Sequence, residues 1–199
     1  MKRHLQKELG ESLLLISIKM KKEIFQEIEI PEGVEANIEG NLLTMKGNKG
    51  ENKRRFDTIN LVFEKRGNKI VIGNKKSTKT DKRMINTIAA HIKNMIRGVQ
   101  ENFEYRLKVC FSHFPITVEI KGKEGIIKNF LGEKTPRKVK IIEGADVKVE
   151  KDIITVTSID KEIAGKVSAD FERATWIRMR DRRIFQDGIF IISKAGEEI

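Results

Sequence analysis

The sequence has 199 residues, and 40 lysines and arginines against 29 aspartates and glutamates give a formal charge of +11 at pH 7. This length allows one or two domains, and the charge favours an anionic partner: nucleic acid, an anionic membrane surface or an acidic protein. Aromatic residues make up only 6%, which argues against broad stacking platforms for single-stranded bases and favours phosphate-dominated binding to structured nucleic acid.

The N-terminal residues and the cysteine content bear on location. The apolar run Leu13–Ile18 is far too short to cross a bilayer, and no small-residue cleavage site follows it. We interpret residues 1–19 as a tail, with Met20 as an alternative start. The single cysteine, Cys110, excludes an intrachain disulfide and is typical of a cytosolic protein.

Strand patterns occupy the first half of the sequence from residue 30. Apolar and polar residues alternate over 30–38, and a glycine-bearing turn separates this predicted strand from a second one over 42–46. Residues 61–72 predict a hairpin that turns at Gly67 and Asn68.

An amphipathic helix is predicted next, because apolar residues recur at helical spacing from Met84 to Val99. Gly98 stands where we expect this helix to end. The candidate N-cap residues are Thr78, Thr80 and Asp81.

The second half repeats this order. Strand patterns cover 114–120 and 125–130, and a hairpin is predicted over 147–157 with its turn at Lys151 and Asp152. A second helix follows, with Ser158 or Asp160 as its N-cap; its apolar residues are Ile163, Ala164, Val167, Phe171 and Ala174.

The two halves therefore predict a duplicated α+β fold. Each copy is a small antiparallel β-sheet packed by one main α-helix, and a tail precedes the first copy. We assign the tail to 1–19, the first repeat to 20–102 and the second repeat to 103–199. The alternative is that common hairpin chemistry produced the similarity by coincidence.

A basic segment runs from Asn129 to Lys140. Gly132 and Pro136 interrupt it, so we expect a shaped loop rather than a helix face. Such a loop presents backbone N–H groups and cations to phosphates, and an ordinary solvated hairpin loop is the alternative. The cations that we predict to contact RNA are Lys134, Arg137 and Lys138.

A cluster of arginines follows the second predicted helix. Arginine suits bidentate phosphate contact, but Asp181 and Asp187 interrupt the cluster, so local ion pairing is the alternative for some members. The cluster begins with Arg173, and its predicted RNA contacts are Arg178, Arg180, Arg182 and Arg183.

Residues that carry metal or catalytic chemistry are sparse. Cys110 and His113 have ligand-like spacing but lack a second pair, so we predict no metal site and no cofactor. We find no nucleotide-binding glycine loop and no carboxylate pair suited to acid–base catalysis.

Four motifs resemble the large-subunit ribosomal protein L-six family, in its archaeal and eukaryotic branch. The resemblance extends over about residues 20–193 in order and spacing. The motifs are SHFPITV at 112–118, NMIRGV at 94–99, NFLGEK at 129–134 and RIFQDGIF at 183–190.

The resemblance implies a non-enzymatic structural constituent of the large ribosomal subunit. It implies binding to large-subunit (23S-type) rRNA, mainly through the second repeat, near the base of the acidic stalk, the sarcin–ricin loop and the factor-binding site. It also implies neighbouring large-subunit proteins as partners, stalk-base proteins among them, with no membrane and no small-molecule substrate. The residues in the matching motifs are Asn129, Gly132, Lys134, Arg183, Asp187 and Gly188.

We therefore expect a cytoplasmic, ribosome-bound rRNA-binding protein. The alternatives are an RNA-modifying or RNA-processing enzyme with a basic surface, and a DNA-compacting protein.

Overall fold

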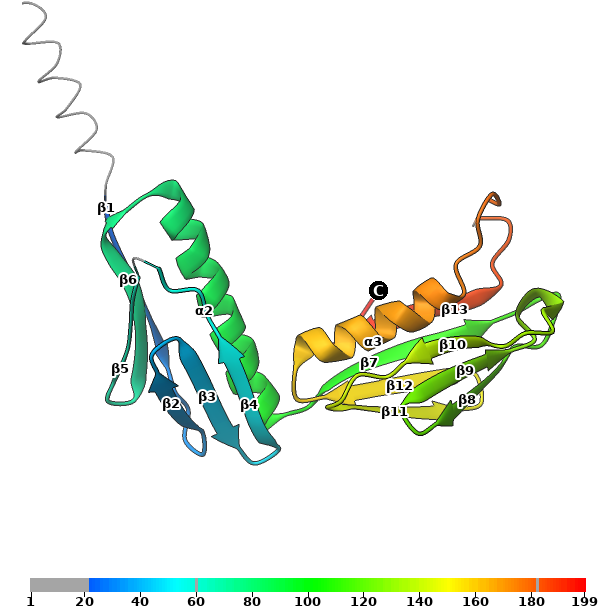
Figure 1. The fold of residues 1–199 in the computed structure, drawn as a ribbon, viewed down its shortest axis with the longest axis horizontal. Coiled ribbons are helices and arrows are strands. Elements are labelled where there is room, and N and C mark those ends of the chain that lie inside the picture. The colour runs from blue at the N-terminus through cyan, green and yellow to red at the C-terminus, as the bar shows by residue number, and fades with distance from the viewer. Residues whose placement is uncertain (1–21, 60, 182) are drawn as a thin grey trace, which may run out of the picture. The chain divides into compact units, whose positions relative to one another are not determined.

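The computed structural model describes residues 22–59, 61–181 and 183–199 (Figure 1). The described residues form two compact units, which divide between Ile96 and Arg97. The predicted tail and Arg182 lie outside the described residues, and the predicted domain boundary after residue 102 stays a prediction. Neither helix in the described part of the chain has the length and apolar composition needed to cross a bilayer.

The first unit contains two three-stranded antiparallel sheets. One has the strand order β1-β6-β5 and the other β2-β3-β4. The predicted hairpin turn at Gly67 and Asn68 is confirmed between β5 and β6. The strands are β1 (Lys22–Glu29), β2 (Glu35–Glu39), β3 (Leu42–Gly47), β4 (Gly50–Arg55), β5 (Val62–Arg66) and β6 (Lys69–Ser77).

Helix α2 (Lys79–Gln100) follows β6, as the apolar periodicity predicts. Thr78 caps it: its hydroxyl oxygen accepts from the Asp81 backbone N–H at 3.3 Å, and the Asp81 carboxylate accepts from the Thr78 backbone N–H at 2.8 Å. The face built on Ile85, Ile92 and Val99 is fully buried.

Gly98 lies inside the last turns of α2 and does not end the helix as expected. A Cβ at this position would stand 2.0 Å from the carbonyl oxygen of Ile159. The glycine is therefore explained by a close backbone approach rather than by the termination of the helix.

The second unit contains a three-stranded sheet of order β10-β9-β8 and a five-stranded sheet of order β11-β12-β7-β13-β14. The predicted turn at Lys151 and Asp152 is confirmed between β11 and β12. The strands are β7 (Phe103–Cys110), β8 (Thr117–Lys121), β9 (Glu124–Lys128), β10 (Arg137–Lys140), β11 (Ala145–Glu150), β12 (Ile153–Ser158), β13 (Gly188–Lys194) and β14 (Glu197–Glu198).

Helix α3 (Lys161–Ala174) packs on the sheets of the second unit. Asp160 is its N-cap and accepts from the Glu162 backbone N–H at 2.8 Å. Ala164, Val167 and Phe171 are fully buried in a core with residues of β7, β9, β12 and β13. The helix thus ties both sheets of this unit together.

The duplication is confirmed in the topology. The order β1-β6-β5 in the first unit corresponds to β7-β12-β11 in the second, and β2-β3-β4 corresponds to β8-β9-β10. One difference stands out: β13 pairs with the second edge of β7, whereas β1 is an edge strand among the described residues. The α+β fold class is therefore confirmed, with two small sheets in each unit.

Candidate nucleic-acid interface

The basic segment between β9 and β10 is a tightly shaped turn. A short 3₁₀ turn, η1, spans Phe130–Gly132. Asn129, Leu131 and Gly132 have φ values of 58°, 54° and 73°, a left-handed region that asparagine and glycine adopt more readily than leucine. Phe130 anchors the turn, since only 1% of its surface is exposed, and the Asn129 side-chain amide donates to the Pro115 carbonyl at 3.0 Å.

Arg137 fastens this turn to the end of α3. Its Nε and Nη2 donate to both carboxylate oxygens of Glu133, at 2.9 and 2.5 Å, and its Nη1 donates to the Ala174 carbonyl at 2.6 Å. The guanidinium carbon also lies 4.4 Å from the centre of the Phe130 ring. The side-chain hydrogen bond from Arg137 holds the pKa of Glu133 below its usual value. The geometry therefore gives Arg137 a structural role, and its contact with RNA stays a prediction.

The lysines of the segment are more accessible. Lys134 is exposed, and Lys138 is exposed while its Nζ lies 3.3 Å from a carboxylate oxygen of Glu124. Surface ion pairs of this kind are weak and readily exchanged, so both ammonium groups are available to an anionic ligand.

The arginine-rich residues 176–186, here called the arginine loop, join α3 to β13. Thr175 closes its base, because the Thr175 hydroxyl accepts from the Ile189 backbone N–H at 2.9 Å and donates to the Glu172 carbonyl at 3.2 Å. Thr175 and Ile189 are both buried. The loop therefore leaves the core and returns to it at neighbouring points.

Asp187 fastens the returning end of the arginine loop to the β7–β8 connection. It is 4% exposed, and its Oδ1 accepts from the Ser112 backbone N–H and hydroxyl at 2.9 and 2.8 Å. Its Oδ2 accepts from the His113 backbone N–H at 3.3 Å and lies 2.9 Å from His113 Nδ1. Burial raises the pKa of Asp187, but the hydrogen bonds from His113 and Ser112 outweigh it and leave the pKa below its usual value.

Three flat side chains stack next to Asp187. The imidazole of His113 lies on the Phe185 ring, with centroids 4.6 Å apart and planes 7° from parallel. The Arg180 guanidinium carbon is 5.5 Å from the centre of the same ring. The stack restrains the loop and holds Arg180 at the surface.

The cations of the arginine loop differ in their surroundings. Arg178 and Arg180 are exposed. Arg183 forms a two-pronged ion pair with Asp181, at 3.1 and 2.8 Å, and this hydrogen bond holds the pKa of Asp181 below its usual value. An anionic ligand at Arg183 must therefore compete with Asp181.

The two predicted basic segments meet at one end of the second unit. The connection between β9 and β10 and the orange loop between α3 and β13 lie at the same end of the unit (Figure 1). Arg137 links the first segment to Ala174 at the end of α3, just before the arginine loop begins, and Asp187 links the other end of that loop to Ser112 and His113. The motifs at 112–118 and 183–190 were each visible in the sequence, but nothing in either motif indicated that they are hydrogen-bonded to each other.

Ser112, His113 and Asp187 are the residue types of a hydrolytic triad, but their geometry is different. In a triad, the serine bonds to one imidazole nitrogen and the aspartate to the other. Here, Ser112 Oγ and Asp187 Oδ2 both lie near Nδ1 of His113, at 3.0 and 2.9 Å. Ser112 also donates directly to Asp187, so the group is a structural clamp. The described residues contain no group of three or more metal-ligating side chains.

Comparison with known proteins identifies close similarity across most of the chain. The sequence profile of the family described as ribosomal protein L6 matches residues 30–102 and 114–188. The large ribosomal subunit protein uL6 of Methanobrevibacter smithii is 47% identical over 171 residues, covering 86% of this chain and 96% of the relative. The uL6 of Methanosarcina mazei is 44% identical over 176 residues, covering 88% and 100%.

Proposed function

The chain belongs to the ribosomal protein L6 family, with archaeal relatives, and from this premise we propose that it is a structural constituent of the large ribosomal subunit. In this proposal the chain binds large-subunit rRNA through the end of its second unit where the basic segment and the arginine loop meet. Family membership favours this structural role over catalysis, and over the RNA-processing and DNA-compacting alternatives.

The observation that carries the RNA-binding proposal is the fastening of two separate basic segments to one scaffold. Arg137 holds the first through Ala174, and Asp187 holds the second through Ser112 and His113. Cations held on a rigid scaffold lose less conformational freedom on binding than cations on a free loop. Their spacing then suits the fixed spacing of phosphates in a folded RNA.

The predicted contact residues divide by role in this proposal. Lys134, Lys138, Arg178 and Arg180 neutralise phosphates. Asn129, Gly132 and Arg137 set the shape of the first segment. Arg183 binds a phosphate in place of the Asp181 carboxylate with which it is paired. Arg182 keeps its predicted contact on sequence grounds alone.

The family resemblance supports a proposal for the location within the subunit. We propose a site near the base of the acidic stalk, the sarcin–ricin loop and the factor-binding site, with neighbouring large-subunit proteins as further partners. A rigid protein body at such a site would hold rRNA helices in a fixed relation and would act in the cytoplasm as part of the ribosome.

A double charge reversal tests the RNA interface. Arg178→Glu together with Arg180→Glu should weaken binding to a large-subunit rRNA transcript in filter-binding assays. It should also lower the magnitude of the slope of log affinity against log salt by about 2, because about one counterion is released for each phosphate contact.

Lys121→Glu with Lys123→Glu is the matched control. It makes the same change in charge at exposed lysines, at the opposite end of β8 and β9 from Asn129 and the turn that follows it. Equal loss of affinity and slope in the two variants would show that net charge alone governs binding and would overturn the proposed interface. Equal affinity for duplex DNA would favour the DNA-compacting alternative.

A further inference from the structure

One edge of a sheet is paired in the second unit, whereas the corresponding edge is unpaired in the first unit among the described residues. In the second unit, β13 pairs antiparallel with β7 and packs against α3. In the first unit, β1 is the counterpart of β7, and it pairs only with β6 among the described residues. The outer edges β5 and β11 are open in both units, so the difference is confined to β1. An open edge presents unpaired backbone N–H and C=O groups that accept another strand.

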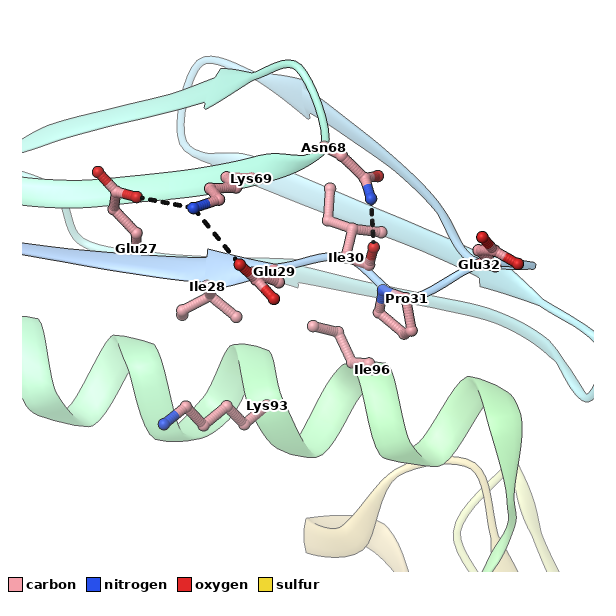
Figure 2. A pocket seen from close by; sticks show the side chains of 10 residues that line it. All are labelled: Glu27, Ile28, Glu29, Ile30, Pro31, Glu32, Asn68, Lys69, Lys93 and Ile96. Atoms are coloured by element: carbon pink, nitrogen blue, oxygen red, sulfur yellow. Dashed lines mark hydrogen bonds and ion pairs between the residues drawn. The ribbon is translucent and has the colours of Figure 1, made fainter.

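A groove lies beside this edge, between β1 and α2. Figure 2 shows Ile28 of β1 facing α2, close to Ile96. The groove has a volume of about 790 Å³, and Ile30 and Pro31 continue its apolar lining. Ile28, Ile30 and Ile96 are each buried. The floor of the groove is therefore apolar, and side chains of an added strand that point toward α2 would lie against it.

The rim of the groove is acidic although the protein is basic. Glu27 and Glu29 flank Lys69, with distances of 3.2 and 3.4 Å from its Nζ to their carboxylate oxygens. Glu32 is exposed at the end of the same groove. Lys69 offsets one carboxylate, and Lys93 lies on the helix side. The strand side therefore keeps an excess of negative charge, which repels a phosphate backbone and attracts a cationic peptide.

We propose that the free edge of β1 is a docking site for an extended basic segment of another protein, which adds antiparallel to β1 as β13 adds to β7. Backbone hydrogen bonds would supply much of the affinity. Alternate apolar side chains would enter the groove, and lysines or arginines between them would meet Glu27, Glu29 and Glu32. The inference uses no contact of the rRNA interface in the second unit, so either proposal can fail without the other.

The test uses the full-length protein and a fluorescent peptide of about nine residues that alternates lysine and valine, long enough to span an edge strand. Anisotropy should show saturable binding. On saturation, amide hydrogen exchange should slow by at least about tenfold in residues 22–29, while exchange in β5 should not change. A peptide of the same composition with its lysines and valines in two blocks should bind at least about fivefold more weakly, because it lacks the alternation of a strand.

Single charge reversals locate the site. Glu29→Lys should weaken binding of the alternating peptide by about threefold to fivefold, the usual size of one exposed charge interaction. Glu64→Lys makes the same charge change at an exposed residue of β5 and should leave affinity within about twofold. Equal effects of the two variants would show non-specific attraction and would overturn the proposal.

The same measurements distinguish other ligands of the β1 edge. Binding only after deletion of residues 1–19 would show that the chain covers its own edge. Stronger protection of residues 22–29 by an oligouridylate than by the peptide would identify an RNA site. Absence of any protection would show that β1 accepts no added strand, as expected if its carboxylates only discourage edge-to-edge pairing. Each of these three results overturns the proposal of a protein partner.

Discussion

Replacing Asp187 by asparagine separates the clamp's positioning effect from its charge. Asparagine keeps an acceptor for the two bonds from Ser112 but loses the charge and places an N–H₂ group beside the His113 backbone N–H and Nδ1. Hydrogen bonds to charged groups contribute about 1.5–3 kcal/mol each and overlap in a shared network. We expect Asp187→Asn to lower the free energy of unfolding by about 2 kcal/mol.

The effect on RNA binding distinguishes two explanations. Removing a negative charge should by Coulomb attraction alone strengthen binding to a polyanion, whereas loosening the arginine loop should weaken it. We expect weaker binding to the rRNA transcript and altered fluorescence of Trp176, the only tryptophan, which lies at the start of the loop. Asp146→Asn removes the same charge at an exposed residue of β11 and serves as the control.

The pH dependence supplies a second measurement. Because the pKa of Asp187 is held below its usual value in the folded protein, its contribution to stability is fully present above about pH 4 and is lost as the pH falls through the folded-state pKa. In urea unfolding followed at Trp176, Asp187→Asn should reduce stability at pH 7 and have progressively less effect at lower pH. RNA binding that tightens equally in the Asp187 and Asp146 variants, with unchanged stability, would refute the positioning role.

Three further substitutions, two of them with a control variant, test the packing of the protein. Gly98→Ala should cost about 3 kcal/mol of unfolding free energy, because its Cβ would stand 2.0 Å from the carbonyl oxygen of Ile159. Gly165→Ala is the control: this glycine lies in α3 with its nearest neighbour at 3.4 Å, so the substitution should be neutral or stabilise the protein by up to about 1 kcal/mol. Urea titration measures both changes. Gly125→Ala should cost about 2 kcal/mol, since its Cβ would lie 2.5 Å from the buried Phe171 ring, and calorimetry should detect a lowered Tm. An unchanged Tm would show that the ring moves aside at little cost. Arg137→Lys should cost about 2 kcal/mol because lysine cannot reproduce the two-pronged bond to Glu133 together with the Ala174 contact; a loss as small as that of Lys138→Ala would show that the fork contributes little.

Local patterns in the sequence determined the repeated α+β fold. Period-two and helical apolar spacing, together with the turns at 67–68 and 151–152, depend on neighbouring residues only. The boundaries shifted where other contacts decided them. Strand patterns from residues 30 and 114 become the shorter β2 and β8, and the pattern over 125–130 gives β9 followed by η1.

The sequence by itself also determined the basic character of two segments in the second half and the turn chemistry of Asn129 and Gly132. Only the tertiary structure decided which charges are engaged within the protein. Arg137 donates to Ala174, 37 residues away, and Asp187 accepts from Ser112, 75 residues away. The structure likewise decided that β13 covers β7 while β1 stays open among the described residues. Periodicity reports which face of an element is buried, but the partners across that face depend on how distant segments pack.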